Sequence, residues 1–316
     1  MEIFVSLVPS ILDSNLFSAF VQDEIALVRD RLYLTMGTKV EQNYYTGWNF
    51  MPTARLAWLP SPRNTLWLAA SRAARTPADT DTSIRVNFAT LPGPGGVPQI
   101  VALLGNPNFG DEHPDAYELG YRGALNRRTS VDVSLYYNIY NNLQTQEPSS
   151  PFFESSPAPA HLVIPFIYDN LMYGEAHGVE LAAHWKATDR WTLSPGYAFE
   201  RIHMHLSPLS HDSSSVREAQ GSTPHQSAQL RSQFALTRAL TWNTSAYFSG
   251  QLADPVEPSY TRLDTGVSWQ FAERSSFGVF GQNLLRDHHT EFVDFNSSVQ
   301  TMLLKRSAYA QFTVKF

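Results

Sequence analysis

The sequence contains no cysteine, which excludes disulfide bonds and thiolate chemistry from all 316 residues. Charge is also scarce, because Asp, Glu, Lys and Arg make up 16% of the chain, against roughly 25% in ordinary soluble domains. The formal net charge is -6, and no Lys- or Arg-rich run offers a surface for nucleic acid. A nucleic-acid partner is therefore not expected.

Long apolar runs are missing as well. No stretch reaches the roughly 18 apolar residues that a transmembrane helix needs, so helical membrane spans are excluded. The only other structure that can cross a bilayer is a β-barrel. Residues 1–20 place no Lys or Arg before their apolar positions and include Glu2, so they do not resemble a secretory signal peptide.

Catalytic signatures are absent too, since no GxSxG, HExxH, Walker or GxGxxG arrangement stands in a supporting context. We therefore expect no enzymatic activity and no cofactor. Aromatic residues, by contrast, reach 13% of the chain. A high aromatic share together with little charge suits a chain that faces lipid on one side.

Apolar and polar residues alternate at the end of the chain. In residues 307–316, Phe312 and Val314 share one face, whereas Gln311 and Thr313 share the other. Successive side chains of a strand point to opposite sides, so this pattern predicts a ribbon between an apolar and a polar medium. A strand of a soluble sandwich would show the same pattern, and only the rhythm of the whole chain distinguishes the two.

The same alternation recurs along the chain and predicts an all-β protein of about thirteen strands, with part of one more in residues 1–9. Connections of about two to four residues alternate with mostly longer ones, of which 76–114 and 144–165 are rich in Pro or Gly and are expected to be loops. Short turns at one end and long loops at the other are typical of outer-membrane barrels. The expected strands are 15–28, 31–43, 53–59, 64–75, 115–125, 128–143, 167–187, 191–205, 226–237, 241–252, 260–271, 275–285 and 307–316.

Six stretches, taken together and in order, resemble the C-terminal part of a TonB-dependent outer-membrane receptor. They cover nearly the whole chain, and their order makes the set more specific than any one of them. The stretches are SAFVQDEIAL (18–27), SRAARTP (71–77), GNPNFGDEHPDAYELGYRG (105–123), GEAHGVEL (174–181), GQNLLRDHHTEF (281–292) and SAYAQFTVKF (307–316).

The resemblance implies a transmembrane antiparallel β-barrel, with short periplasmic turns and long extracellular loops. Residues 1–316 would supply about 13 to 14 of the family's 22 strands. The plug domain, the TonB-binding segment and the signal peptide are expected to be absent from this chain. In the family, such receptors lie in the outer membrane of Gram-negative-type bacteria and import iron–siderophore complexes or similar scarce solutes. The resemblance thus implies outer-membrane lipid, such a solute and TonB as partners, with a fragment not expected to transport alone.

Arginines near the largest expected loop are candidates for solute binding. The planar guanidinium group bonds carboxylate or catecholate oxygens through two N–H groups at once. The alternative is that each arginine faces inward and pairs with an Asp or Glu of a neighbouring strand. The candidates are Arg72, Arg75 and Arg85.

Aromatic and histidine side chains in or near expected loops form the second group of candidates. Aromatic rings can stack on a ligand, and neutral imidazole is a common metal or metal-chelate contact. The alternatives are packing between loops for the aromatics and ordinary loop polarity for the histidines, because no carboxylate or Cys completes a recognised metal set. The candidates are Phe88, Phe109, Phe152, Phe153, His203, His205, His288 and His289.

Five tryptophans lie near strand ends beside the short turns, at similar depth in different hairpins. This recurrence favours an aromatic girdle at the periplasmic membrane interface over buried core residues. The competing class of protein is a soluble all-β ligand-binding protein, such as a carbohydrate-binding sandwich or propeller. The two classes differ in whether the apolar strand faces contact lipid or a protein core. The tryptophans are Trp58, Trp185, Trp191, Trp242 and Trp269.

Overall fold

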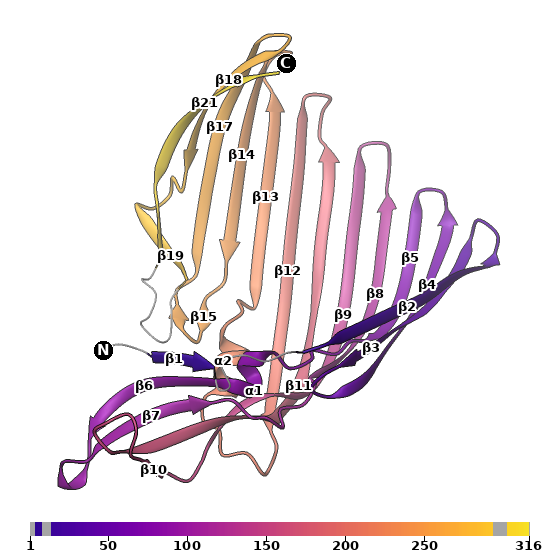
Figure 1. Cartoon of the computed structure of the whole chain (residues 1–316). Coiled ribbons are helices and arrows are strands. Elements are labelled where there is room, and N and C mark those ends of the chain that lie inside the picture. Colours follow the sequence, from indigo (N-terminus) through magenta and orange to yellow (C-terminus); the bar gives the residue numbers. More distant parts are fainter. Residues whose placement is uncertain (1–3, 8–13, 293–301, 316) are drawn as a thin grey trace.

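The computed structural model describes residues 4–7, 14–292 and 302–315, and most of them belong to one 17-stranded sheet (Figure 1). Thirteen of these strands form a curved wall in which each strand pairs antiparallel with the next. The wall runs in the order β2 (Leu16–Val28), β3 (Leu32–Asn43), β4 (Gly47–Ser61), β5 (Asn64–Arg72), β8 (His113–Ala124), β9 (Thr129–Pro148), β11 (His161–Lys186), β12 (Trp191–Leu206), β13 (Gln226–Ala235), β14 (Leu240–Ser249), β17 (Tyr260–Ala272), β18 (Ser275–Gln282) and β21 (Ser307–Val314).

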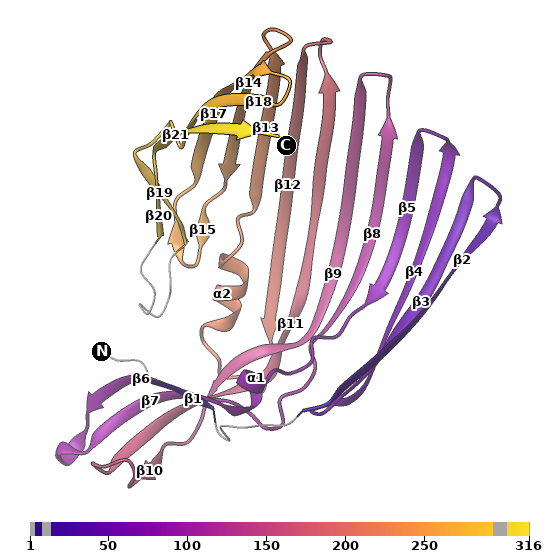
Figure 2. The same cartoon turned by 45° about the horizontal axis from the view of Figure 1, so that its top comes forward.

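The expected number of wall strands is therefore confirmed. The wall bends into a trough whose two margins, β2 and β21, lie apart in both views (Figures 1 and 2). Among the described residues, β2 pairs with β3 alone and β21 with β18 alone. No helix in the described part of the chain is long and apolar enough to span a bilayer.

The two ends of the wall differ in their connections. At what we call the short-turn end, the hairpins close within a few residues, at 29–31, 62–63, 125–128, 187–190, 236–239 and 273–274. The opposite end, which we call the long-loop end, carries the connections 73–112, 149–160, 207–225, 250–259 and 283–306, and the one short connection 44–46. The predicted asymmetry between the two ends is confirmed.

The register of the strands divides the wall into two faces. Leu181 of β11 stands opposite Tyr197 of β12 and Val133 of β9, and its neighbour Glu180 stands opposite Ala198 and Ser134. Directly opposed residues point to the same side of a sheet, and neighbours along a strand point to opposite sides. The wall thus has an apolar side and a polar side.

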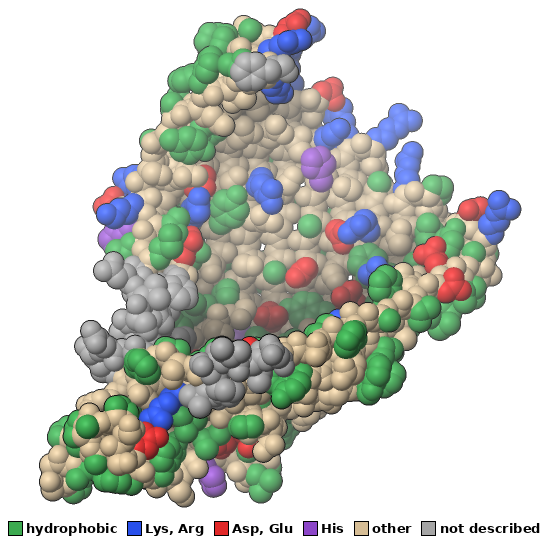
Figure 3. All heavy atoms as spheres, in the orientation of Figure 1, with side chains coloured by type: hydrophobic (Ala, Val, Ile, Leu, Met, Phe, Trp, Pro, Cys, Tyr) green, Lys and Arg blue, Asp and Glu red, His purple; other side chains and the backbone are tan. Residues whose placement is uncertain are grey.

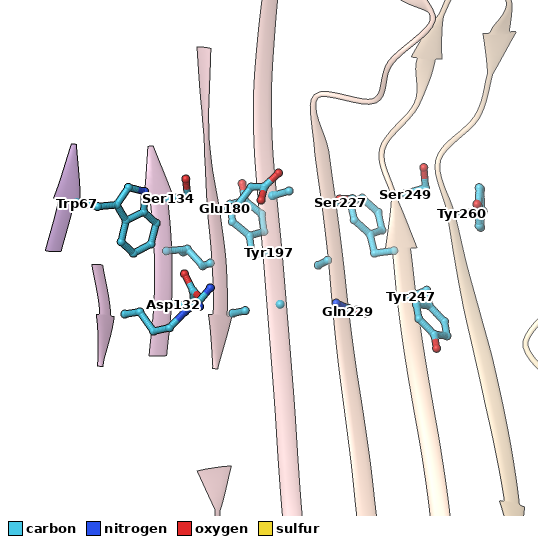
Figure 4. A pocket seen from close by; sticks show the side chains of 17 residues that line it. Trp67, Asp132, Ser134, Glu180, Tyr197, Ser227, Gln229, Tyr247, Ser249 and Tyr260 are labelled. Carbon is cyan, nitrogen blue, oxygen red and sulfur yellow. The ribbon is translucent and has the colours of Figure 1, made fainter. Parts of the chain in front are cut away.

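The polar side is the hollow one. Glu180, Ala198 and Ser134 line a cavity of about 730 Å³ on the inner side of the trough (Figure 4). Charged side chains are scattered over this hollow (Figure 3). We call this side the concave face and the opposite side the outer face. The apolar outer face exposes large side chains such as Leu181 and Leu135 instead of burying them.

Four further strands form a small sheet at the long-loop end, below the wall in Figure 1. We call these strands, with residues 161–167 of β11, the arm. The strand β7 pairs in parallel with β11, whereas the other arm pairings are antiparallel. The arm strands are β1 (Phe4–Leu7), β6 (Ile84–Pro92), β7 (Pro98–Leu104) and β10 (Phe152–Glu154).

The arm corrects two predictions, because 76–114 and 144–165 are not plain loops. Residues 84–104 form a hairpin whose turn contains Gly95 and Gly96, both at positive φ, where a side chain would be strained. The Pro- and Gly-rich segment is therefore the turn that joins two paired strands, and not a long loop. In the second segment, β9 continues to Pro148 and β11 begins at His161. Only residues 149–160 remain between them, and β10 lies within this connection.

Short elements complete the long-loop end, where most of the buried apolar side chains of the described residues lie. Val86, Ala102, Leu103 and Val163 pack between the arm strands. A single-layer wall has no second layer to cover it, so only the arm and its junction with the wall form an ordinary core. The short elements are α1 (Asp79–Ser83), η1 (Pro94–Gly96), α2 (Ser215–Gly221), β15 (Leu252–Ala253), β16 (Val256–Glu257), β19 (His288–Phe292) and β20 (Met302–Lys305).

A pair of substitutions in β11 tests the two faces. Leu181→Arg on the apolar outer face should lower the free energy of unfolding in lipid by about 2–4 kcal/mol, because a charge near the bilayer midplane is poorly solvated. Ala182→Arg, one residue along, should cost much less, since Ala182 lies on the concave face opposite Asp132. Equal losses for the two variants in reversible unfolding would contradict the assigned faces.

Candidate functional site

The concave face carries a band of polar and aromatic side chains from several strands. Trp67 of β5 lies between two guanidinium groups, with Arg55 5.9 Å and Arg122 6.0 Å from its ring centroid. Arg122 in turn donates to Asp132 at 2.5 Å. Figure 4 shows Trp67, Asp132 and other labelled side chains arranged around the cavity. This surface offers hydrogen-bond partners and an aromatic plane to a solute that enters the trough.

A partly buried ion cluster joins the wall to the long-loop end. Arg75, just beyond β5, donates to Glu112 at 2.6 Å and to Asp81 of α1 at 2.7 Å. Asp81 also accepts hydrogen bonds from the Ala78 amide at 2.9 Å and from Gln144 at 3.1 Å. These contacts connect four segments of the chain, and the hydrogen bond to Glu112 raises the pKa of Arg75 above its usual range, so this cation stays charged.

A second cluster ties β10 to β6 within the arm. Arg85 of β6 donates to both carboxylate oxygens of Glu154, at 2.7 and 2.8 Å. The buried ring of His161 lies with Nε2 3.1 Å from Glu154 Oε2 and Nδ1 2.9 Å from the Pro159 carbonyl oxygen. The Arg85 guanidinium holds the pKa of the Glu154 carboxyl below its usual range. The arm is therefore closed by a charged pair as well as by its strands.

Asp212 anchors the connection between β12 and β13. Its carboxylate accepts from the amides of Gln146 at 2.6 Å, Ser214 at 2.7 Å and Ser215 at 2.9 Å, and from the Ser215 hydroxyl at 2.5 Å. Burial alone would raise the pKa of Asp212, but these donors outweigh burial and hold it below its usual range. The carboxylate thereby fixes the start of α2 against β9.

The three candidate arginines are all engaged with carboxylates. Arg72 lies on the outer face and donates to Asp115 at 2.7 and 2.8 Å, while Arg75 and Arg85 belong to the two clusters above. Each of the three arginines thus pairs with an Asp or Glu, as in the alternative interpretation, although Arg72 does not face inward. Arg72 points away from the concave face, so its assignment as a loop or lumen contact is corrected.

The four candidate phenylalanines do not form one surface. Phe109 is 2% exposed and packs against Arg75 and Tyr168, so it serves the core of the long-loop end. Phe88 is half-buried beside a small cavity that Asp212 also lines. Phe152 and Phe153 of β10 are exposed. Of this group, Phe152 and Phe153 remain the most accessible to a ligand.

The candidate histidines are placed differently from the expectation. His203 and His205 lie on the outer face of β12, opposite Glu175 and Tyr173, and not in a loop or on the concave face. Both lie within the expected strand 191–205, in the same alternation as Tyr197, which places them on the outer side of the wall. The prediction that these two histidines contact a solute in the lumen therefore does not agree with their outer-face position.

The adjacent pair His288 and His289 is split by the strand β19. His288 is exposed, whereas His289 is buried, with Nδ1 3.2 Å from Asn283, Nε2 2.9 Å from Glu291 and its ring stacked on Tyr260 at 4.2 Å. Within the described ranges, no group of three or more His, Cys, Asp or Glu side chains could hold a metal ion. In the described part of the chain, the contacts of His289 thus hold the β19 segment in place.

The sequence interpretation missed the acidic partners, namely Asp81, Glu112, Glu154 and Asp212. One signal was available, because Asp79 and Asp81 follow Ala78 at spacings typical of a helix start. Glu112 lies 37 residues from Arg75 in the sequence, and Glu154 lies 69 residues from Arg85. No local sequence pattern reports contacts between residues so far apart. All five tryptophans, by contrast, are exposed on the outer face near the short-turn end, at one depth as expected.

A curved antiparallel wall with an apolar outer face, a polar concave face and unequal ends defines the wall of an outer-membrane-type barrel. The model of the family "TonB dependent receptor-like, beta-barrel" matches residues 6–284. The chain belongs to this family of outer-membrane transport proteins, which decides against a soluble sandwich or propeller and against an enzyme. No match was found among curated proteins.

Solved structures of siderophore receptors share the fold. The ferric enterobactin receptor PfeA of Pseudomonas aeruginosa is 17% identical with a TM-score of 0.71, over 96% of this chain and 45% of the receptor. The siderophore receptor PirA of Acinetobacter baumannii is 14% identical with a TM-score of 0.74, over 96% and 46%. The ferric-catecholate import receptor Fiu of E. coli K12 is 13% identical with a TM-score of 0.67, over 95% and 44%. This chain spans slightly less than half of each receptor.

Removing the cation of the first cluster should loosen the long-loop end. Arg75→Ala leaves Asp81 and Glu112, whose side chains are 10% and 12% exposed, close together without a counter-charge. We expect a loss of about 2 kcal/mol, less than for a fully buried pair because Arg75 is itself half-exposed. Amide exchange over 76–112 in detergent measures the loss. Arg127→Ala, in an exposed short turn, is the control, and equal exchange in both variants would refute the role of Arg75.

The arm should weaken in acid. The folded pKa of Glu154 is lowered by Arg85, so the stability from this pair is complete above the ordinary glutamate pKa and is lost as the pH falls through the lower folded value. Exchange protection of 84–92, corrected for intrinsic rates, should therefore fall below about pH 4. Glu154→Gln should remove this pH dependence, whereas Glu257→Gln in the β15–β16 hairpin should keep it. An unchanged profile in Glu154→Gln would contradict the assignment.

Proposed function

We propose that this chain forms part of the barrel wall of an outer-membrane receptor. The receptor takes up an iron–siderophore complex or a similar scarce solute with energy from TonB. The observation that carries the proposal is the family match over residues 6–284, on a wall whose concave face is polar and whose outer face is apolar. The solved structures with the same fold are named as receptors for ferric enterobactin, siderophores and ferric catecholates. Their low identity to this chain supports the fold, and the solute class is our inference.

In this proposal the long-loop end faces the outside of the cell and the short-turn end faces the periplasm. Outer-membrane barrels have short periplasmic turns and long extracellular loops. The five exposed tryptophans then lie at the periplasmic boundary of the membrane, where aromatic side chains are enriched. The arm and the two ion clusters stand above the membrane, at the mouth of the trough.

The solute would first meet the arm. Phe152 and Phe153 are exposed on β10, directly next to the Arg85–Glu154 pair. Exposed rings beside a fixed charge suit an aromatic, anionic iron chelate, because rings can stack and the guanidinium can share its donors. Phe88 and Arg75 are secondary candidates, since Phe88 lines only a small cavity and Arg75 is already held by Glu112 and Asp81. The concave face, with Trp67 between Arg55 and Arg122, would line the path beyond the arm.

Coupling to TonB belongs to the whole receptor. In the family, the plug domain and the TonB-binding segment couple energy to release of the solute. The described wall supplies neither, and we propose that the residues matched here act together with such parts. Transport is therefore expected from an assembled receptor and not from an isolated wall.

Uptake in the host bacterium tests the proposal. Deleting the gene should reduce uptake of one radioiron-labelled solute in a panel of catecholate, hydroxamate and haem complexes, and restoring the gene should recover that uptake. The double variant Phe152→Ser/Phe153→Ser should lower the recovered uptake about thirtyfold at equal surface level, because two stacking contacts of about 1 kcal/mol each are lost. Val256→Ser, at an exposed site of the β15–β16 hairpin, is the matched control.

Two results would contradict the proposal. The receptor assignment is wrong if deletion of the gene leaves the uptake of every solute in the panel unchanged and also leaves the uptake of added cobalamin unchanged. If uptake depends on the gene but the double variant behaves like Val256→Ser, the receptor assignment stands and the role of the arm is wrong.

A further inference from the structure

The outer face changes its chemistry abruptly along β11 and β12. From the short-turn end, the outer-face residues of both strands are apolar or aromatic over four or five positions, and then become polar. No acidic or basic side chain belongs to the apolar part of this sequence. In β11 the order is Trp185, Ala183, Leu181, Val179, then His177, Glu175, Tyr173; in β12 it is Trp191, Leu193, Pro195, Tyr197, Phe199, then Arg201, His203, His205.

The change falls where a membrane boundary would lie. From Trp191 to Arg201 the strand β12 advances ten positions, and a rise of about 3.3 Å per residue gives about 33 Å along the strand. A tilt of about 40° reduces this to about 25 Å across the membrane, the usual height of the apolar band of such barrels. Since the tryptophans mark one boundary, His177 and Arg201 lie at the other, level with lipid headgroups.

The polar side chains form a continuous row across four strands. Tyr117 of β8, Tyr137 of β9, His177 of β11 and Arg201 of β12 stand directly opposite one another in successive strand pairs. The next position of β12, two residues on, adds His203, and His205 follows. We call these six residues the interfacial row.

The rings of the interfacial row contact one another. The centroids of Tyr137 and His177 are 6.5 Å apart, and those of His177 and His203 are 6.1 Å apart, both pairs nearly parallel. His205 packs on Tyr173 at 5.6 Å. The row is therefore an ordered surface of flat, hydrogen-bonding rings, which is the kind of surface on which sugar rings rest.

The positive charge of the row has no carboxylate partner. Arg201 is exposed, and in the described part of the chain its only assigned contact is with the ring of Phe199, 5.8 Å away. Every arginine of the two ion clusters, by contrast, has an Asp or Glu within 3 Å. A guanidinium left without a carboxylate at this depth suits a phosphate, which it binds through two parallel N–H groups.

The two carboxylates that neighbour the row on its own strands, Glu175 and Asp115, are already engaged. Glu175 accepts a hydrogen bond from the Tyr137 hydroxyl at 2.7 Å, and Asp115 is held by both donors of Arg72. They therefore repel an anion less than free carboxylates would. Exposed imidazoles of His203 and His205 add N–H donors beside Arg201.

We propose that the interfacial row binds the phosphorylated saccharide headgroup of a glycolipid in the outer leaflet of the membrane. Arg201 binds a phosphate group, His203 and His205 donate further hydrogen bonds, and the rings of Tyr137 and His177 support the sugar. The acyl chains lie along the apolar band below the row. This inference rests on the membrane orientation under the proposed function, but not on which solute the receptor carries.

Glycolipid retention by the whole protein tests this site. Protein extracted from outer membranes in mild detergent is weighed by native mass spectrometry, and bound phosphorylated glycolipid is counted. The triple variant Arg201→Gln/His203→Gln/His205→Gln should retain at least tenfold less glycolipid than the unaltered protein. Arg231→Gln removes an arginine from the concave face and should leave retention unchanged. Equal retention in the triple variant and the unaltered protein would overturn the proposal.

A single variant and two ligand arms cover the remaining outcomes. Arg201→Gln should lower retention more than Arg201→Lys does, even if the triple variant does not fold, and equal retention in these two would also overturn the proposal. Enzymatic removal of the phosphates should weaken binding to the unaltered protein. If inorganic phosphate alone displaces the glycolipid, the site is an anion site and not a headgroup site. The uptake assay is scored separately, so a failure of lipid binding is distinguished from a failure of the receptor assignment.

Discussion

Pairing of backbone N–H and C=O groups between neighbouring strands is the interaction on which the rest of this structure depends. The wall is one sheet thick, so its strands cannot gain much from packing against a second layer. Each strand instead satisfies its polar backbone through the next strand, which is the condition for placing a polypeptide in hydrocarbon. β11 carries the largest share, because it pairs with β9, β12, β7 and β10. The arm is thereby an extension of the same ladder.

Different rules hold once the chain leaves the apolar band. At the long-loop end, Ala102 and Val163 are fully buried, and carboxylates such as Asp81 and Asp212 collect several donors each. These are the features of an ordinary soluble core, where buried polar groups must be paired. The protein thus combines a lipid-facing wall, stabilised by its ladder, with a small water-facing arm that is stabilised by packing and ion pairs.

The strands of the wall could be predicted because each one records its own surroundings. Leu181 and Glu180 differ in polarity because they face different media. The alternation of apolar and polar residues within β11 shows this without knowledge of the strands that pair with it. The strands β6 and β7 escaped prediction because prolines and glycines around residues 92–98 resemble a loop, and because β7 is defined by a distant partner. Arg75 and Arg85 could be found as candidates, but Glu112 and Glu154, which bind them, could not. His203 and His205 fall within the expected strand 191–205, but the side of the sheet on which they lie depends on their register with β11, which no local pattern reports.

The parallel pairing of β7 with β11 also constrains the order in which the chain assembles. Gln99 meets Leu162 across the whole β8–β9 hairpin, so this contact closes a loop of about sixty residues. Hairpins such as β8–β9 join neighbours in sequence and close at a much smaller entropic cost. We therefore expect the arm to close after the adjoining β8–β9 hairpin has formed. Until then, residues 84–104 remain without the strand on which their core is built.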